Sequence, residues 1–197
     1  HPVLTSAQAG KYFSKEKAEI EKIVAGAKQK LLAEREKRAK PFRDDKIITA
    51  WNGLALSGFA AALKIAPKTE YFEAIQRTVN FILAKLFRDG FLLHCYKDGQ
   101  AKLRGYLDDY AFLAVGLLDI YEVLFDPALR DRAVALCDTM LKEFWDDLDS
   151  GFFYTGLSHE QLISRSKPIF DASIPSGNAM AVQLLLRVHH LTGDDDY

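Results

Sequence analysis

The sequence has few of the features that would assign it to several large classes of protein. Its two cysteines, Cys95 and Cys137, form no CxxC pair and no metal-type spacing. Its net charge is −1, which gives no electrostatic reason to expect binding to nucleic acid or to an anionic membrane. Its longest apolar run, residues 54–63, is interrupted by Ser57 and Gly58 and is too short to span a bilayer.

Signatures of several common enzyme sites are missing as well. The chain has no glycine-rich phosphate loop, no HExxH and no GxSxG. From these absences we expect a reduced, cytoplasmic protein that uses no metal and no cofactor. No leader is visible, and the chain opens at His1 instead of a methionine. We therefore expect it to be a piece of a longer protein.

Two kinds of helix alternate along the chain. Helices of the first kind are amphipathic, with apolar residues at steps of three and four, and are expected over residues 15–39, 70–87 and 130–145. Helices of the second kind are apolar nearly all round and are expected over residues 54–63, 111–118 and 179–186. A helix that is apolar on every face is expected to be buried on every face. The sequence therefore predicts outer and inner helices in alternation.

This alternation predicts an all-α protein, a partial α/α toroid of about three helical hairpins. A superhelical solenoid would show the same alternation, but its repeats are usually shorter and more uniform. We expect residues 1–197 to form a single domain, a fragment of an (α/α)6 barrel whose open sides are apolar.

Two insertions interrupt the helices. Residues 90–104 read as a β-hairpin, because Asp98-Gly99 is a turn pair between two strand-like runs. Residues 151–156 read as a further short strand. Each insertion lies between an outer helix and the next inner helix, so both are expected at the end of the toroid where the inner helices begin.

Three polar segments, residues 44–53, 106–111 and 171–179, precede or open the three inner helices. Because helix N-termini present free N–H groups, polar residues at equivalent starts indicate a shared pocket. Paired carboxylates can act as acid and base in glycoside hydrolysis, which makes Asp45 and Asp109 the predicted catalytic pair. The predicted ligand-binding residues are Asp44, Trp51, Asn52, Asp108, Tyr110, Asp171, Ser176 and Asn178.

Helix capping is the competing interpretation of these residues. Asp, Ser and Asn are preferred N-caps, so Asp108 or Asp109, and Ser176, fit either role. Capping explains the whole set less well, since Trp51 and Tyr110 are not capping residues. Gly53 and Gly177 fit a packing role.

The histidines argue against a conventional sugar epimerase. Such enzymes are expected to use imidazoles for proton transfer near neutral pH. None of His1, His94, His159, His189 and His190 belongs to the three polar segments. His94 lies in the β-hairpin insertion and is within reach of the pocket, although a lone histidine there is more often a turn or surface residue.

Three stretches of sequence resemble the signature of a known family. Residues 43–54, 105–111 and 174–179, together with 151–155, resemble bacterial thioredoxin-domain-containing proteins related to animal spermatogenesis-associated protein 20. The resemblance implies a thioredoxin-like domain followed by an (α/α)6 barrel similar to those of N-acylglucosamine 2-epimerases and six-hairpin glycosidases. This chain matches a middle part of the barrel and lacks the thioredoxin-like part. The resemblance implies a fold and does not assign a reaction.

The function expected from these observations is that of a carbohydrate-active barrel domain, glycosidase- or epimerase-like, with a sugar or sugar-like small molecule as its partner. A non-catalytic ligand-binding or scaffold module of a thioredoxin-fold protein is the alternative, and a protein-interaction solenoid is a third. Nucleic acid and membrane are not expected as partners. The uncovered inner helices predict self-association, or packing on the rest of the parent chain.

Overall fold

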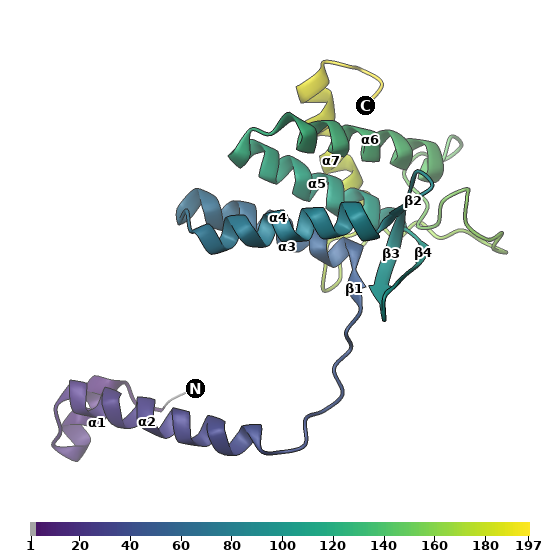
Figure 1. Ribbon diagram of the computed structural model, residues 1–197. Helices are drawn as coiled ribbons and strands as arrows, with labels where there is room; N and C mark the ends of the chain where they lie inside the picture. The colour runs from purple at the N-terminus through teal and green to yellow at the C-terminus, as the bar shows by residue number, and fades with distance from the viewer. Residues whose placement is uncertain (1–2) are drawn as a thin grey trace. The chain divides into compact units, whose positions relative to one another are not determined.

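The computed structural model describes residues 3–197, which divide into two compact units (Figure 1). The first unit ends at Asp44, and the second is Asp45–Tyr197. The prediction of a single domain over residues 1–197 stays a prediction. None of the helices in the described part of the chain is long and apolar enough to cross a membrane.

The first unit is a pair of helices, α1 (Ser6–Phe13) and α2 (Lys17–Glu36). Thr5 caps α1, because its hydroxyl accepts from the Gln8 N–H while the Gln8 side chain accepts from the Thr5 N–H. The amphipathic helix predicted over residues 15–39 is therefore present as α2. Its place as an outer helix of the toroid stays a prediction.

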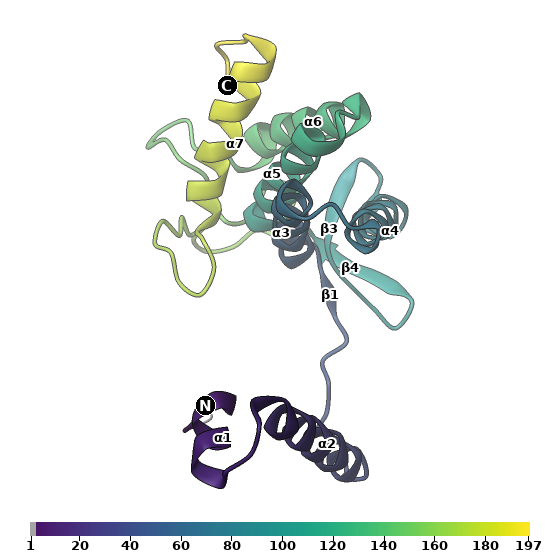
Figure 2. The same ribbon diagram turned by 90° about the vertical axis from the view of Figure 1, so that its left-hand side faces the viewer.

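The second unit contains five long helices: α3 (Thr49–Ile65), α4 (Thr69–Lys85), α5 (Leu107–Leu124), α6 (Pro127–Phe144) and α7 (Gly177–Thr192). Helix α5 packs between α3 and α7, while α4 packs on α3 and α6 packs on α5. Figure 2 shows α4 and α6 on one side of the row formed by α3, α5 and α7. This is the predicted partial α/α toroid, with inner helices α3, α5 and α7 and outer helices α4 and α6.

Helix α5 is the centre of the core, and it is buried over nearly its whole length. The expectation that all three apolar helices would be buried on every face is correct for α5 and wrong for α3 and α7. Within the predicted stretches, Ala55 and Ala61 of α3 are exposed, and Val182 and Leu186 of α7 are 54% and 57% exposed. The reason is position, because only α5 has an inner helix on both sides.

An ion-pair network joins the three inner helices near their C-terminal ends. The Arg187 guanidinium of α7 binds Asp119 and Glu122 of α5, both at 2.8 Å. Lys64 of α3 binds the other oxygen of Glu122 at 3.1 Å. The three inner helices therefore run in the same direction, as the toroid requires.

The β-hairpin insertion is confirmed. Strand β3 (Phe91–Lys97) pairs with β4 (Gln100–Arg104), and Asp98 and Gly99 form the two-residue turn with positive φ angles. Two further strands were not anticipated: β1 (Ile47–Ile48) and β2 (Phe87–Arg88) pair antiparallel with β3. Strand β1 leads directly into α3, so the sheet joins the starts of two inner helices.

The prediction of a short strand over residues 151–156 is wrong. Only an isolated bridge between Trp145 and Phe152 forms there. The backbone groups of this segment find other partners: Asn178 bonds both the N–H and the C=O of Phe152, and the N–H of Tyr154 donates to Ser166. A side chain thus takes the place of a neighbouring strand.

Candidate functional site

The N-terminal ends of the three inner helices meet. The N–H of Ala50, at the start of α3, donates to Asp109 Oδ1 in the first turn of α5 at 2.9 Å. Gly177 opens α7 beside Asp108 and Leu107, and a Cβ at this glycine would overlap Asp108 Oδ1 and lie 3.0 Å from Leu107 Cδ2. Within the second unit, the three polar segments therefore come together at one rim, as their order in the sequence predicts.

Both insertions lie at the same rim. His94 of β3 contacts Asp109 of α5. In the second insertion, the Tyr154 carbonyl accepts from the N–H of Leu107, the first residue of α5, at 3.1 Å. The rim is therefore built from helix starts, one β-hairpin and one irregular loop.

Asp109 is the most buried acid of the rim, with 1% of its surface exposed. Its Oδ1 accepts from Ala50, and its Oδ2 accepts from the Tyr106 N–H at 2.9 Å and from His94 Nδ1 at 2.8 Å. It therefore acts as a cap for its own helix and as a tie to α3 and β3. Because both oxygens are engaged, this geometry favours a positioning role over direct contact with a ligand.

His94 is the residue of the rim whose role was not inferred from the sequence. Its Nδ1 faces an acceptor carboxylate, so Nδ1 carries the proton, and within residues 3–197 its Nε2 has no hydrogen-bond partner. The side chain is 25% exposed, and the pKa of His94 is raised mainly by the hydrogen bond to Asp109. The only sequence signal was its place in the β-hairpin, since the pairing with Asp109 depends on how the hairpin packs on α5.

Asp108 differs from its neighbour. Its Oδ1 is buried and has no hydrogen-bond partner, and its side chain faces the small residue Gly177. Burial, followed by the charge of Asp109, raises the pKa of Asp108 to about 6, while His94 opposes the rise. The adjacent acids therefore point in different directions, as expected for consecutive residues of a helix.

Replacing Asp108 should change how stability depends on pH. Because the pKa of Asp108 is raised to about 6 in the folded chain, its ionisation is resisted there, and stability falls as pH rises from about 4 to 6. Asp108→Asn should remove this fall and gain about 1–2 kcal/mol at pH 7, a figure lowered for solvent screening of the partly exposed carboxyl. Urea unfolding at pH 4.5 and pH 7 measures the effect, and an equal loss at both values would contradict it.

Aromatic rings line the rim next to these acids. Tyr106 stacks on Tyr154, with ring centroids 4.9 Å apart and planes 7° from parallel. His94 approaches the Tyr106 ring edge-on at 5.0 Å, and His159 lies at 5.2 Å. Both nitrogens of His159 are occupied, Nδ1 by the N–H of Gly156 and Nε2 by the Arg104 carbonyl, and burial lowers its pKa.

The other predicted site residues divide into structural and exposed groups. The Tyr110 hydroxyl accepts from the Leu92 N–H, and Asn52 donates to the Ile48 carbonyl. At α7, Ser176 is the N-cap, Asp171 accepts from the Ser176 N–H, and Asn178 holds Phe152. Asp44, Asp45 and Trp51 are exposed. The catalytic pairing of Asp45 with Asp109 stays a prediction, although one of the two is exposed and the other buried.

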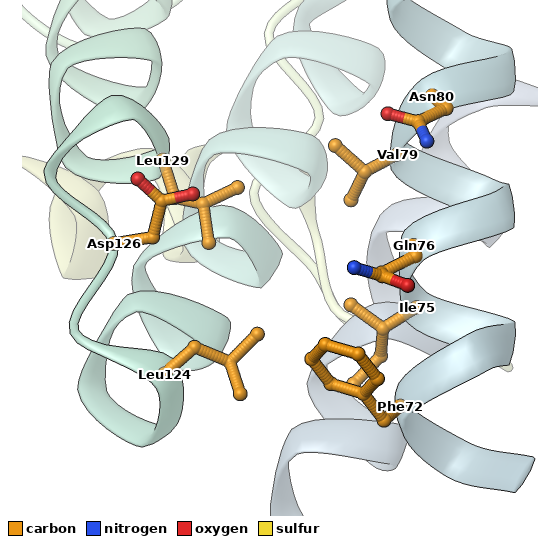
Figure 3. Close-up of a pocket in the computed structure, with 8 residues that line it drawn as sticks. All are labelled: Phe72, Ile75, Gln76, Val79, Asn80, Leu124, Asp126 and Leu129. Carbon is orange, nitrogen blue, oxygen red and sulfur yellow. The ribbon is translucent and has the colours of Figure 1, made fainter. Parts of the chain in front are cut away.

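Two cavities of the second unit lie away from the acids of the rim. One, of about 360 Å³, is on the outer wall between α4 and α6, where Figure 3 shows Phe72, Gln76 and Asn80 of α4 facing Asp126 and Leu129. Another, of about 400 Å³, includes Lys46, Asn52 and Arg77. No group of three histidine, cysteine or acidic side chains among residues 3–197 is arranged to hold a metal ion.

Comparison with known sequences confirms the resemblance seen in the motifs. No family model matches the chain. Human spermatogenesis-associated protein 20 is 33% identical to it over 180 residues, which are 86% of this chain and 23% of the human protein. The chain is a homologue of one part of spermatogenesis-associated protein 20. An uncharacterised protein of Caenorhabditis elegans is 28% identical over 188 residues, 91% of this chain and 26% of that protein.

The chain spans about a quarter of the length of these relatives. The thioredoxin-like domain that the resemblance to spermatogenesis-associated protein 20 implies, and the cytoplasmic location, therefore stay predictions.

Comparison with solved structures confirms the fold. Cellobiose 2-epimerase from Bacillus thermoamylovorans has a TM-score of 0.64 at 15% identity, covering 80% of this chain and 42% of that one. A family 105 glycoside hydrolase from C. acetobutylicum has a TM-score of 0.59 at 16% identity, covering 97% and 56%. The GH76 α-mannanase BT2949 of Bacteroides thetaiotaomicron has a TM-score of 0.57 at 14% identity, covering 81% and 43%. At these identities the likeness establishes the α/α toroid alone.

Proposed function

We propose that this chain is part of a carbohydrate-active barrel domain that binds a sugar or sugar-like molecule at the rim where the inner helices begin. The observation that carries the proposal is the convergence of His94, Tyr106 and Asp108 from a β-hairpin and a helix start. Aromatic faces and hydrogen-bonding groups of both kinds are what a polyhydroxylated ring requires. The names of the structural neighbours, sugar epimerases and glycoside hydrolases, support the same class of ligand.

The predicted pair Asp45 and Asp109 would serve glycoside hydrolysis only if both carboxyls faced the scissile bond across about 5–9.5 Å. Asp109 instead accepts three hydrogen bonds from the protein. This favours chemistry in which Asp109 holds another group in place.

A non-catalytic ligand-binding or scaffold module is the second candidate, and a specific observation favours it. The side chains of Asp109, Tyr110 and Asn178 accept hydrogen bonds from backbone N–H groups, as structural residues do. The exposed apolar residues of α7, Val182 and Leu186, are where we propose that the chain associates with itself or with the rest of its parent protein.

Saturation-transfer NMR with a panel of aldohexoses and N-acetylhexosamines tests the proposal. At least one sugar should give a signal with the wild-type chain, and Asp108→Asn should weaken it, because this substitution removes a carboxyl of the rim. Asp126→Asn is the matched control, since Asp126 also stands at a helix start but caps the outer helix α6. Absence of a signal from every sugar, or equal loss in both variants, would count against sugar binding at the rim.

A further inference from the structure

We infer that His94 is the general base of this rim, with Nε2 directed to a ligand hydroxyl and Asp109 as the positioning residue that holds Nδ1. The inference rests on the proposed function and gives that site a proton acceptor. It does not use Asp45. No histidine belongs to the three polar segments, but His94 reaches the rim from the β-hairpin.

Asp109 fixes the tautomer of the His94 imidazole. Asp109 is surrounded by donors, the N–H groups of Ala50 and Tyr106 and the ring nitrogen of His94. A carboxylate fixed by two backbone N–H groups can take only a donor as its third partner, so the imidazole proton is held on Nδ1. The lone pair of His94 is then on Nε2.

His94 is partly exposed, and its partner Asp109 is buried. The His94 side chain is 25% exposed, whereas the Asp109 side chain is 1% exposed. The imidazole therefore bridges a buried carboxylate and the surface, with one edge against the Tyr106 ring at 5.0 Å. A base must be anchored on one side and open on the other, and His94 meets both conditions.

Charged groups from two segments act on His94. The groups that act on His94 are Asp109 and Asp108 from α5, which raise its pKa, and Lys46 from the segment before β1, which lowers it. Burial also lowers it, and the largest single effect is the hydrogen bond that His94 donates to Asp109, which raises it. The pKa of the His94 imidazole is therefore raised above its ordinary value of 6.5.

A second histidine of the rim, His159, has hydrogen-bond partners at both ring nitrogens. His159 also lies against Tyr106, but backbone groups occupy both of its nitrogens. His159 is thus a structural histidine that shares the aromatic neighbour Tyr106 with His94. The contrast assigns the role of base to His94 and supplies a control.

The chemical step is a proton transfer. The O–H bond of the ligand hydroxyl breaks, its proton forms a bond to His94 Nε2, and the electron pair stays on the ligand oxygen. The imidazolium so formed is stabilised by the Asp109 carboxylate, to which Nδ1 stays hydrogen-bonded. No oxidant, metal or cofactor is needed for this step.

Reaction with diethyl pyrocarbonate, mapped by mass spectrometry on the whole chain, tests the inference. The reagent attacks an unprotonated imidazole nitrogen, so His94 should react about tenfold faster than His159, which must first break a backbone hydrogen bond. The pH midpoint of the His94 reaction should lie above 6.5 and fall in Asp109→Asn, whereas a merely structural Asp109 would leave it unchanged. If His94 reacts no faster than His159, the inference is wrong, whether or not any sugar binds.

Adding each sugar of the same panel separates this inference from the proposed function. A sugar that binds at the rim should slow the modification of His94 and leave His159 unaffected, and His94→Gln should lose most of the saturation-transfer signal. A sugar signal without protection of His94 would overturn the assignment of the base and leave the proposed function standing. No signal and no protection from any sugar would overturn both. His94→Gln also keeps the test usable if Asp109→Asn fails to fold.

Discussion

Asp109→Ala should destabilise the chain by about 3–5 kcal/mol, the usual cost of removing one partner from a buried charged contact. The substitution leaves the N–H groups of Ala50 and Tyr106 without their acceptor and the His94 imidazole without its partner. Because Asp109 joins α3, α5 and β3, the loss should be cooperative across the rim. Urea unfolding followed by circular dichroism measures it.

Asp126→Ala is the control for Asp109→Ala. Asp126 caps α6 through a single bond to the Ala128 N–H on an exposed surface, so its removal should cost about 1 kcal/mol. Equal losses from the two substitutions would mean that Asp109 is only a helix cap. Asp109 would then not be the residue that holds α3, α5 and β3 together.

Gly53→Ala should cost about 2–3 kcal/mol, although alanine is the better helix former. A Cβ at Gly53 would lie 2.5–2.6 Å from the backbone of Phe112 and Leu113 on α5. Backbone atoms of a central helix cannot move aside, so α3 and α5 would be forced apart. Thermal or urea unfolding detects the change.

Gly58→Ala on the same helix is the matched control. No atom lies within 4 Å of a Cβ at Gly58, so only the gain in helix propensity remains, and stability should rise by about 0.5–1 kcal/mol. The two substitutions are thus expected to have opposite signs. A neutral or stabilising Gly53→Ala would refute the close approach of the two inner helices.

The arrangement of the helices could be predicted because the spacing of apolar residues indicates which faces of a helix can be buried. Residues 111–118 carry no charge, and this stretch became the buried core of α5. The same reasoning erred for α3 and α7, since an apolar face shows only that a helix can be covered. Ala55 and Leu186 remain exposed because no neighbour lies over them within the second unit.

The position of the site at the helix starts could be predicted, but the side chains that form it could be predicted only in part. Asp108, Asp109 and Ser176 stand at helix starts that local sequence marks. Whether each residue caps a helix or faces a ligand depends on contacts between segments far apart in sequence. His94 could not be singled out for this reason, because its partner Asp109 is on another element and no spacing encodes the pair.

The segment after α6 shows the same limit. Residues 151–156 have the composition of a strand, but Asn178 supplies the hydrogen bonds that a neighbouring strand would give. Local propensity describes what a segment can form. The partner that it finds is decided by the rest of the fold.

A ¹⁵N-histidine NMR titration of the whole chain with the sugar panel, at pH 8, tests the central claim most directly. The account predicts that neutral His94 carries its proton on Nδ1 and that its Nε2 resonance moves when a sugar is added, while the resonances of His159 stay in place. A proton on Nε2 of His94, or an Nε2 resonance that no sugar shifts, would contradict the account.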